Sequence, residues 1–177
     1  LPDLHAVLHA HSPGLVAFSI ARILPSTRLT PELSAVCGAL AMADYRLPGS
    51  EELGAVIADA LADGTDVVVL ENHGVVIGAD SIFRAFMRFE TLENSCRLQI
   101  NALRLGPLRP LSDEHIRIAG QKTRAELSEF IPNRHSSEEN AARRDLITLI
   151  RRSYDQQLFS STQGTYSVRL DDGSFLI

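Results

Sequence analysis

Residues 66–78, which read DVVVLENHGVVIG, decide the fold class of this chain. The run 67–70 is apolar and mostly β-branched without alternation, which is typical of a strand buried on both faces. Residues 72–74 form a turn signal, and residues 75–78 are predicted to be the strand that returns. Because helical patterns lie on both sides of this hairpin, the sequence indicates a mixed α/β fold.

The helical patterns around the hairpin have recognisable ends. Ser50 is predicted to cap a helix that ends near Gly64, with Glu51 and Glu52 in the first turn, where the helix dipole favours negative charge. Residues 33–43 are small and apolar, and their pattern leaves both a helix and a buried strand open. Further helices are predicted over residues 14–24, 81–105, 112–131 and 137–158.

The longest predicted helix, residues 81–105, carries an apolar stripe at helical spacing. Glu93 falls on or beside this stripe and has two interpretations. It is either a boundary carboxylate paired with Arg97 four residues on, or a partner that orients a metal ligand. The predicted inner residues of the helix are Ile82, Phe86, Phe89, Cys96 and Ile100.

Three histidines carry the chemistry that the sequence predicts. His9 and His11 lie in or directly after a predicted strand over residues 6–10, and His73 lies in the hairpin turn. Because side chains of a strand alternate between faces, His9 and His11 point the same way. Neutral imidazole is the commonest protein ligand for a transition metal. The pattern therefore predicts a metal site of three histidines with one coordination position open for chemistry.

Two other interpretations of these histidines stay open at this point. His5 and His9 are four residues apart and would share one face of a helix, which is also a spacing of metal ligands. Pro2 and the alternation of Val7, His9 and His11 favour the strand instead. His9 and His11 could also be ordinary histidines near a strand end, hydrogen-bonded to backbone or water.

Composition and charge limit the classes of partner. The chain has 177 residues, 45% hydrophobic and 22% charged, with a net charge of −5. It has no basic patch with interleaved aromatic residues, so we expect no nucleic-acid partner. No apolar run approaches the roughly 20 residues of a membrane span, and the N-terminus lacks the features of a signal peptide. Cys37 and Cys96 lie in apolar or helical surroundings, which favours two buried free thiols and a cytoplasmic location.

The C-terminal segment has a different pattern. Residues 132–137 are the predicted linker, and Ser136 with Glu139 forms a capping box for the helix that follows. Residues 164–170 alternate like a strand, and residues 171–173 are a hairpin turn. The chain then ends inside the returning strand and begins without Met, so we expect it to be part of a longer protein.

Three motifs together resemble the class II aldolase/adducin family, which includes fuculose-phosphate aldolases and ribulose-phosphate 4-epimerases. They are HAHS at residues 9–12, YRLPGSEEL at residues 45–53 and ENHGVV at residues 71–76. The resemblance covers about residues 1–110, as the latter half of such a domain. The tail, QGTYSVR at residues 163–169 followed by DGSFLI at residues 172–177, resembles the opening hairpin of the same domain.

This order predicts a division into three segments. Residues 1–131 are the C-terminal part of one aldolase/adducin-like domain, and residues 132–137 are the linker. Residues 138–177 are the N-terminal helix and hairpin of a second domain, or of the same domain in permuted order. The catalytic glutamate that the family carries upstream of its His-x-His strand has no counterpart here, so no catalytic residue is assigned.

The resemblance also implies a fold, a metal and an assembly. The family's fold is a three-layer α/β/α sandwich around a mostly antiparallel sheet, commonly in a tetramer with active sites between subunits. The implied metal is zinc, or another divalent ion, held by His9, His11 and His73. Tyr45 falls in the family's Tyr-x-x-x-Gly-Ser/Thr segment and is interpreted as structural.

The implied function is that of a metal-dependent lyase or epimerase. Its substrate would be a small hydroxylated carbonyl compound, such as a sugar phosphate, and its chemistry a metal-stabilised enediolate. Thr165 stands where the family usually has an Asn that helps to hold the phosphate, which favours a decarboxylase or dehydratase as the alternative. A non-catalytic assembly module like adducin is the third hypothesis. The three retained histidines argue against it, because a scaffold has no need of an open metal site.

Overall fold

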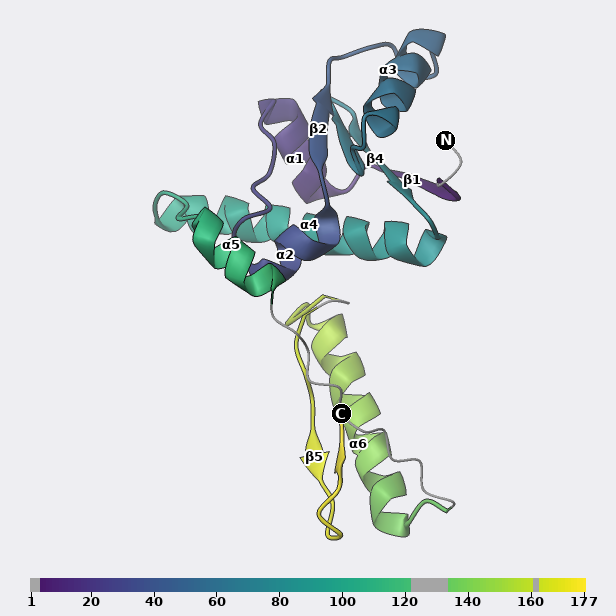
Figure 1. The fold of residues 1–177 in the computed structure, drawn as a ribbon, viewed down its shortest axis with the longest axis vertical. Helices are drawn as coiled ribbons and strands as arrows, with labels where there is room; N and C mark the ends of the chain where they lie inside the picture. Colours follow the sequence, from purple (N-terminus) through teal and green to yellow (C-terminus); the bar gives the residue numbers. More distant parts are fainter. Residues whose placement is uncertain (1–3, 122–133, 161–162) are drawn as a thin grey trace. The chain divides into compact units, whose positions relative to one another are not determined.

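The computed structural model describes residues 4–121, 134–160 and 163–177 (Figure 1). The chain divides into two compact units, Leu1–Gln121 and Lys122–Ile177, which are described separately. The division into segments 1–131, 132–137 and 138–177 stays a prediction. Residues 122–133, where the first two segments would meet, lie outside the described residues.

The first unit is built on a four-stranded sheet in the order β1-β4-β3-β2. β1 pairs antiparallel with β4, and β4 pairs antiparallel with β3. β2 instead runs parallel to β3, so the sheet is mixed, and the prediction of a mostly antiparallel sheet is wrong. Parallel neighbours need a crossover, and α3 (Glu51–Ala62) supplies it. The strands are β1 (Ala6–Ala10), β2 (Leu40–Ala43), β3 (Val67–Leu70) and β4 (Gly74–Ala79).

Helices cover both faces of this sheet, as the α/β sandwich predicts. Alternate residues of β3 face opposite layers: Val67 joins the core cluster of α1, α2 and α4, whereas Val68 joins the cluster under α3. This explains why β3 and β4 are buried along their whole length and read as unbroken apolar runs. The helices of the first layer are α1 (Pro13–Ala21), α2 (Pro31–Cys37) and α4 (Ile82–Leu105).

The ambiguous segment 33–43 contains both structures that the sequence left open. Its first part ends α2 at Cys37, and its last part is β2. The change occurs at Gly38, whose φ of 69° lies in the region that favours glycine. A side chain there would also collide with the carboxylate of Asp66.

The predicted inner stripe of α4 is only partly correct. Cys96 is buried, and Phe89 and Ile100 pack against the core. Ile82 and Phe86 are 63% and 47% exposed, so that part of the prediction is wrong. The buried positions of α4 include several polar side chains, which hydrophobic periodicity does not detect. They are Thr91, Glu93, Ser95 and Gln99.

Two other predicted helices, over residues 14–24 and 112–131, end earlier than expected or leave the described part of the chain. α1 ends at Ala21 because Arg22 adopts a left-handed conformation with φ 55°. α5 is described as Asp113–Gly120, and the rest of predicted helix 112–131 lies outside the described residues. Among the described residues, no helix is both long and apolar enough to cross a membrane.

The described residues of the second unit form one helix and one hairpin. α6 (Ser137–Asp155) begins at Ser136, whose hydroxyl accepts a hydrogen bond of 3.0 Å from the Glu139 amide. The hairpin pairs β5 (Val168–Arg169) with β6 (Phe175–Leu176) in antiparallel register. Within this unit, the Tyr166 hydroxyl donates to Ser153 Oγ at 2.6 Å and so joins the segment before β5 to α6.

Candidate metal centre

The three predicted histidines lie at one end of the sheet. β1 ends at Ala10, and its partner in the ladder, Val75, lies near the beginning of β4. The turn between β3 and β4 is at the same end, because the two strands are antiparallel neighbours. The topology therefore brings together residues that are more than 60 positions apart in the sequence.

His9 is held by the β1–β4 pair. Its backbone is in register with Val76, and its Nδ1 donates a hydrogen bond of 2.9 Å to the Val75 carbonyl oxygen. A carbonyl can only accept, so Nδ1 carries the proton and the lone pair is on Nε2. This is the arrangement in which a backbone carbonyl orients a metal-binding imidazole.

His11 lies one residue beyond the end of β1, outside the ladder of hydrogen bonds. Its Nε2 is 3.0 Å from the Nε2 of His9. Gly74 is what gives the His11 ring its space, since a Cβ at Gly74 would lie 2.5 Å from His11 Cδ2 and 2.5 Å from the Ala10 carbonyl oxygen. The glycine in the Asn-His-Gly turn is therefore required by a close approach.

His73 is placed by the tight turn between β3 and β4. Its amide donates to the Leu70 carbonyl at 3.1 Å, and Asn72 takes a left-handed φ of 53°. Nδ1 of His73 is buried and has no hydrogen-bond partner in the described part of the chain. Burial lowers the pKa of His73 below its usual range, and the neighbouring His9 and His11 lower this pKa further. The ring is thus kept in the neutral form that a metal needs.

The three side chains form one cluster. One nitrogen from each ring lies within 4.8 Å of the others, and the ring centroids are 4.7 to 5.0 Å apart. Two nitrogens that bind one zinc ion tetrahedrally lie roughly 3.3 Å apart, close to the 3.0 Å between His9 and His11. Three imidazoles, with the lone pair of His9 oriented and a buried nitrogen of His73 without a partner among the described residues, fit a divalent ion of the zinc type.

β1 decides one of the two other interpretations of the histidines. Because residues 6–10 form a strand, the helical pairing of His5 with His9 is wrong. His5 is not a member of the cluster, and neither is any carboxylate or thiol of the described residues.

Glu71 and Tyr45 lie at the same end of the sheet. Glu71 follows β3, and its carboxylate accepts a hydrogen bond of 3.1 Å from the Tyr45 amide, which follows β2. It also lies 3.7 Å from the Arg22 guanidinium. The contact joins the Tyr45 segment to the histidine turn through the Tyr45 backbone, and the structural role of Tyr45 stays a prediction. Sequence reasoning missed Glu71; its place directly before Asn72 and His73 was the only signal.

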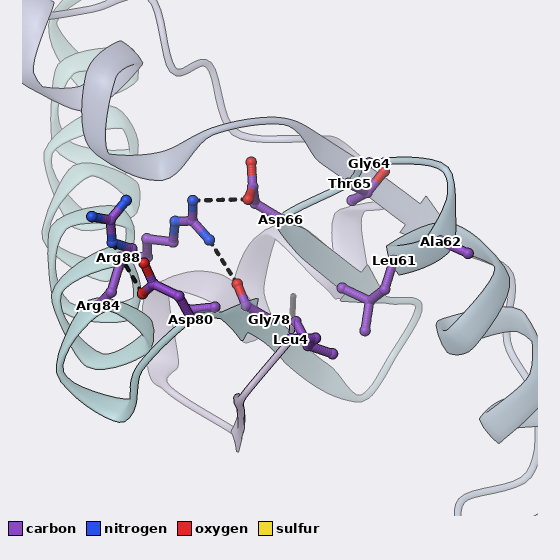
Figure 2. Close-up of a pocket in the computed structure, with 11 residues that line it drawn as sticks. Leu4, Leu61, Ala62, Gly64, Thr65, Asp66, Gly78, Asp80, Arg84 and Arg88 are labelled. Atoms are coloured by element: carbon purple, nitrogen blue, oxygen red, sulfur yellow. Dashed lines mark hydrogen bonds and ion pairs between the residues drawn. The ribbon is translucent and has the colours of Figure 1, made fainter. Parts of the chain in front are cut away.

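The pocket in Figure 2 lies at the opposite end of the sheet. It has a volume of about 370 Å³ and lies beside the end of β4 and the residue before β3. Its Arg88 pairs with Asp66 at 2.8 Å and donates to the Gly78 carbonyl at 2.6 Å, and its Arg84 pairs with Asp80 at 3.2 Å. These charges are already paired, so the histidine cluster is the better candidate for a functional site.

Comparison with known proteins identifies the family of the first unit. The family described as "Class II Aldolase and Adducin N-terminal domain" matches residues 1–100. An L-fuculose phosphate aldolase of Methanococcus maripaludis is 34% identical over 54% of this chain and 51% of its own length. A 3-oxo-tetronate 4-phosphate decarboxylase of Cupriavidus necator is 34% identical over 54% of this chain and 46% of its own. Human beta-adducin is 28% identical over 58% of this chain and 14% of its own.

Solved structures with a similar fold also include aldolases of this family. An L-fuculose 1-phosphate aldolase has a TM-score of 0.57 at 26% identity, over 67% of this chain and 55% of its own. The L-fuculose 1-phosphate aldolase of Glaciozyma antarctica has a TM-score of 0.56 at 27% identity, over 67% of this chain and 44% of its own length.

The first unit is thus an α/β sandwich with a cluster of histidines at one end of its sheet. The chain belongs to the class II aldolase and adducin family, since the match covers more than half of it. It spans about half the length of the fuculose phosphate aldolase that it matches.

Proposed function

We propose that His9, His11 and His73 bind one divalent metal ion, zinc or a similar ion. We further propose that the chain serves as a metal-dependent lyase or epimerase of the aldolase type. The observation that carries the proposal is the convergence of three imidazole nitrogens within 4.8 Å. The proposed substrate is a small hydroxylated carbonyl compound such as a sugar phosphate.

A divalent ion bound here would supply Lewis-acid stabilisation of negative charge on the oxygens of such a substrate. The residues of the chain hold and orient that ion. Val75 fixes the tautomer of His9, and burial keeps His73 neutral. His9 and His11 are exposed, so a small molecule has access to the open side of the cluster.

A decarboxylase is the alternative with support of its own. The decarboxylase relative and the aldolase relative are both 34% identical to this chain. The same metal could stabilise the negative charge left when carbon dioxide departs, so the histidine site serves either reaction. An assembly role like that of adducin has weaker support, because ordered and oriented histidines are not needed by a scaffold.

The remaining parts of the proposal concern assembly and location. From the family resemblance we propose a homo-oligomer, either a tetramer or a tandem-domain assembly, and from the two buried free thiols a cytoplasmic location. Neither nucleic acid nor membrane is a proposed partner.

The first experiment measures metal content by mass spectrometry on protein purified without a histidine tag. We expect close to one equivalent of a divalent ion, and loss of most of it in the His73→Ala variant, because a three-ligand site loses a third of its ligands. The control is His115→Ala, which removes an exposed histidine of α5.

Absence of metal in the wild type, with no uptake of added zinc, would contradict the metal site. Retro-aldol and decarboxylation assays on the loaded protein then separate the two reactions. A loaded protein that is inactive in both assays, and in an epimerisation assay as well, would contradict the enzymatic proposal.

A further inference from the structure

Glu93 is a buried carboxylate of α4 that the proposed chemistry does not use. It is 8% exposed and accepts four hydrogen bonds. Oε2 accepts from the Ser12 hydroxyl at 2.7 Å and from the Leu15 amide at 2.9 Å. Oε1 accepts from the Gly14 amide at 3.0 Å and from Arg97 Nε at 2.7 Å. Three of these four donors belong to one short segment at the beginning of α1.

The carboxylate replaces the cap that α1 lacks. Ser12 is the N-cap residue, but its side chain accepts no capping hydrogen bond: its hydroxyl donates to Glu93, and the Leu15 amide also donates to Glu93. Pro13 has no N–H, so the first free donors of the helix are the amides of Gly14 and Leu15. Glu93 accepts from both, and its negative charge lies at the positive end of the helix dipole.

The contact between Glu93 and the first turn of α1 is closely packed. A Cβ on Gly14 would lie 2.8 Å from Glu93 Oε2 and 3.0 Å from the Cβ of Cys96. Burial by itself raises the pKa of Glu93, but the hydrogen bonds from Ser12, Arg97, Gly14 and Leu15 outweigh burial, so this pKa lies below its usual range. Glu93 therefore remains charged and anchored.

The anchored segment directly follows His11. The ladder of β1 ends at Ala10, so no strand hydrogen bond holds His11. Ser12 is the next residue, and it is attached to Glu93. His9 has its own support from Val75, and His73 is supported by its turn. Of the three histidines, His11 is thus the one whose backbone position depends on a contact with α4.

We propose that Glu93 is a positioning residue for metal binding, which holds His11 in place through Ser12 and the first turn of α1. This inference rests on the proposed metal site. Glu93 is itself neither a ligand nor a proton carrier, because both of its oxygens already accept two hydrogen bonds each. The pairing with Arg97 that the sequence suggested is one of these four contacts.

The test compares Glu93→Gln with a matched control, Asp66→Asn. Gln keeps the size of Glu, but its NH₂ group faces N–H donors whichever way the amide is turned. Asp66 is also a carboxylate that joins α4 to a backbone amide, since it pairs with Arg88 and accepts from the Ala39 amide at 3.0 Å (Figure 2 shows the Arg88 pair). It lies at the end of the sheet away from the histidines.

The first readout is zinc affinity, measured by competition with a chromophoric chelator. We expect Glu93→Gln to weaken zinc binding roughly 10- to 100-fold, the usual effect of losing a group that orients a ligand. Asp66→Asn should leave the affinity within about twofold, because distant sites act independently. Equal affinities for Glu93→Gln and the wild type, with both variants less stable to heat, would reduce Glu93 to a structural role and overturn the inference.

A second readout needs no metal. In the metal-free protein, ¹⁵N relaxation should show greater mobility of His11 in Glu93→Gln, with His9 unchanged. If the wild type binds no zinc, the proposed function fails, and this measurement still decides whether Glu93 holds His11. Unchanged relaxation at His11 would overturn the inference on its own.

Two substitutions of Ser12 are smaller changes, which test the inference even if Glu93→Gln does not fold. Ser12→Ala removes one of the four hydrogen bonds, whereas Ser12→Thr keeps the hydroxyl. We expect weaker zinc binding in Ser12→Ala and recovery in Ser12→Thr. Equal affinities in the two variants would contradict the role of Ser12 as the connection.

Discussion

At the scale of single residues, the candidate site depends on atoms that have little freedom. His9 is oriented by one carbonyl oxygen, and His11 fits because position 74 has no side chain. His73 keeps a buried nitrogen without a partner among the described residues. These features favour a bound ion, since leaving a polar atom buried and unpaired costs about 1–3 kcal/mol.

Gly74→Ala tests the close approach directly. The new Cβ would meet the Ala10 carbonyl and the His11 ring, so the ring must move. We expect a loss of about 1–3 kcal/mol in the free energy of unfolding from overpacking, together with weaker zinc binding. Denaturant unfolding and a chelator competition measure the two effects.

Gly54→Ala is the matched control for this variant. Gly54 lies in α3 with nothing within 4 Å of an added Cβ. Ala should stabilise this helix by about 0.5–1 kcal/mol, without a change in zinc affinity. If Gly74→Ala binds zinc as tightly as the wild type, the glycine is not needed for the position of His11.

At the scale of elements, the turn between β3 and β4 determines where His73 lies. Asn72 occupies a left-handed conformation that Asn tolerates better than most residues. Its amide donates to the Ser19 carbonyl of α1 at 3.3 Å, which joins the turn to the helix that follows His11. The turn is thus attached to the layer of α1 and α4.

Substitution of Asn72 should separate backbone conformation from side-chain chemistry. Asn72→Gly keeps the left-handed conformation accessible and should change stability little. Asn72→Ala should cost about 1–2 kcal/mol and weaken zinc binding, since His73 is the next residue. Thermal unfolding and zinc titration of both variants give the comparison; equal losses in Gly and Ala would mean that the Asn side chain matters instead.

At the scale of the whole molecule, the candidate site belongs to the first unit alone. All three histidines, and the helices that support them, lie within Leu1–Gln121. A ligand that binds only the folded form stabilises it by mass action. Zinc should therefore stabilise the first unit.

Calorimetry with and without zinc checks this expectation. At a free concentration of 100 times Kd, zinc should add about 2.7 kcal/mol to the free energy of unfolding, and a chelator should reverse the gain. The His9→Ala/His73→Ala double variant should show no such gain. An equal gain in the double variant would place the bound zinc elsewhere in the chain.

The sequence by itself determined much of this protein, because the relevant signals are local. Alternation placed β1 at residues 6–10, the unbroken apolar run identified β3, and Ser50 marked the beginning of α3. The three histidines could be selected because period-two geometry and a turn signal need no distant information.

Only the tertiary structure decided the parts that depend on contacts distant in sequence. The parallel pairing of β2 with β3 depends on the path of α3, and the buried face of α4 depends on which helices cover it. Glu93 shows the same limit, since its donors lie 78 to 81 residues away, apart from Arg97. A sequence pattern reports which face a local segment can bury, whereas the partner of that face is chosen by the packing of the whole unit.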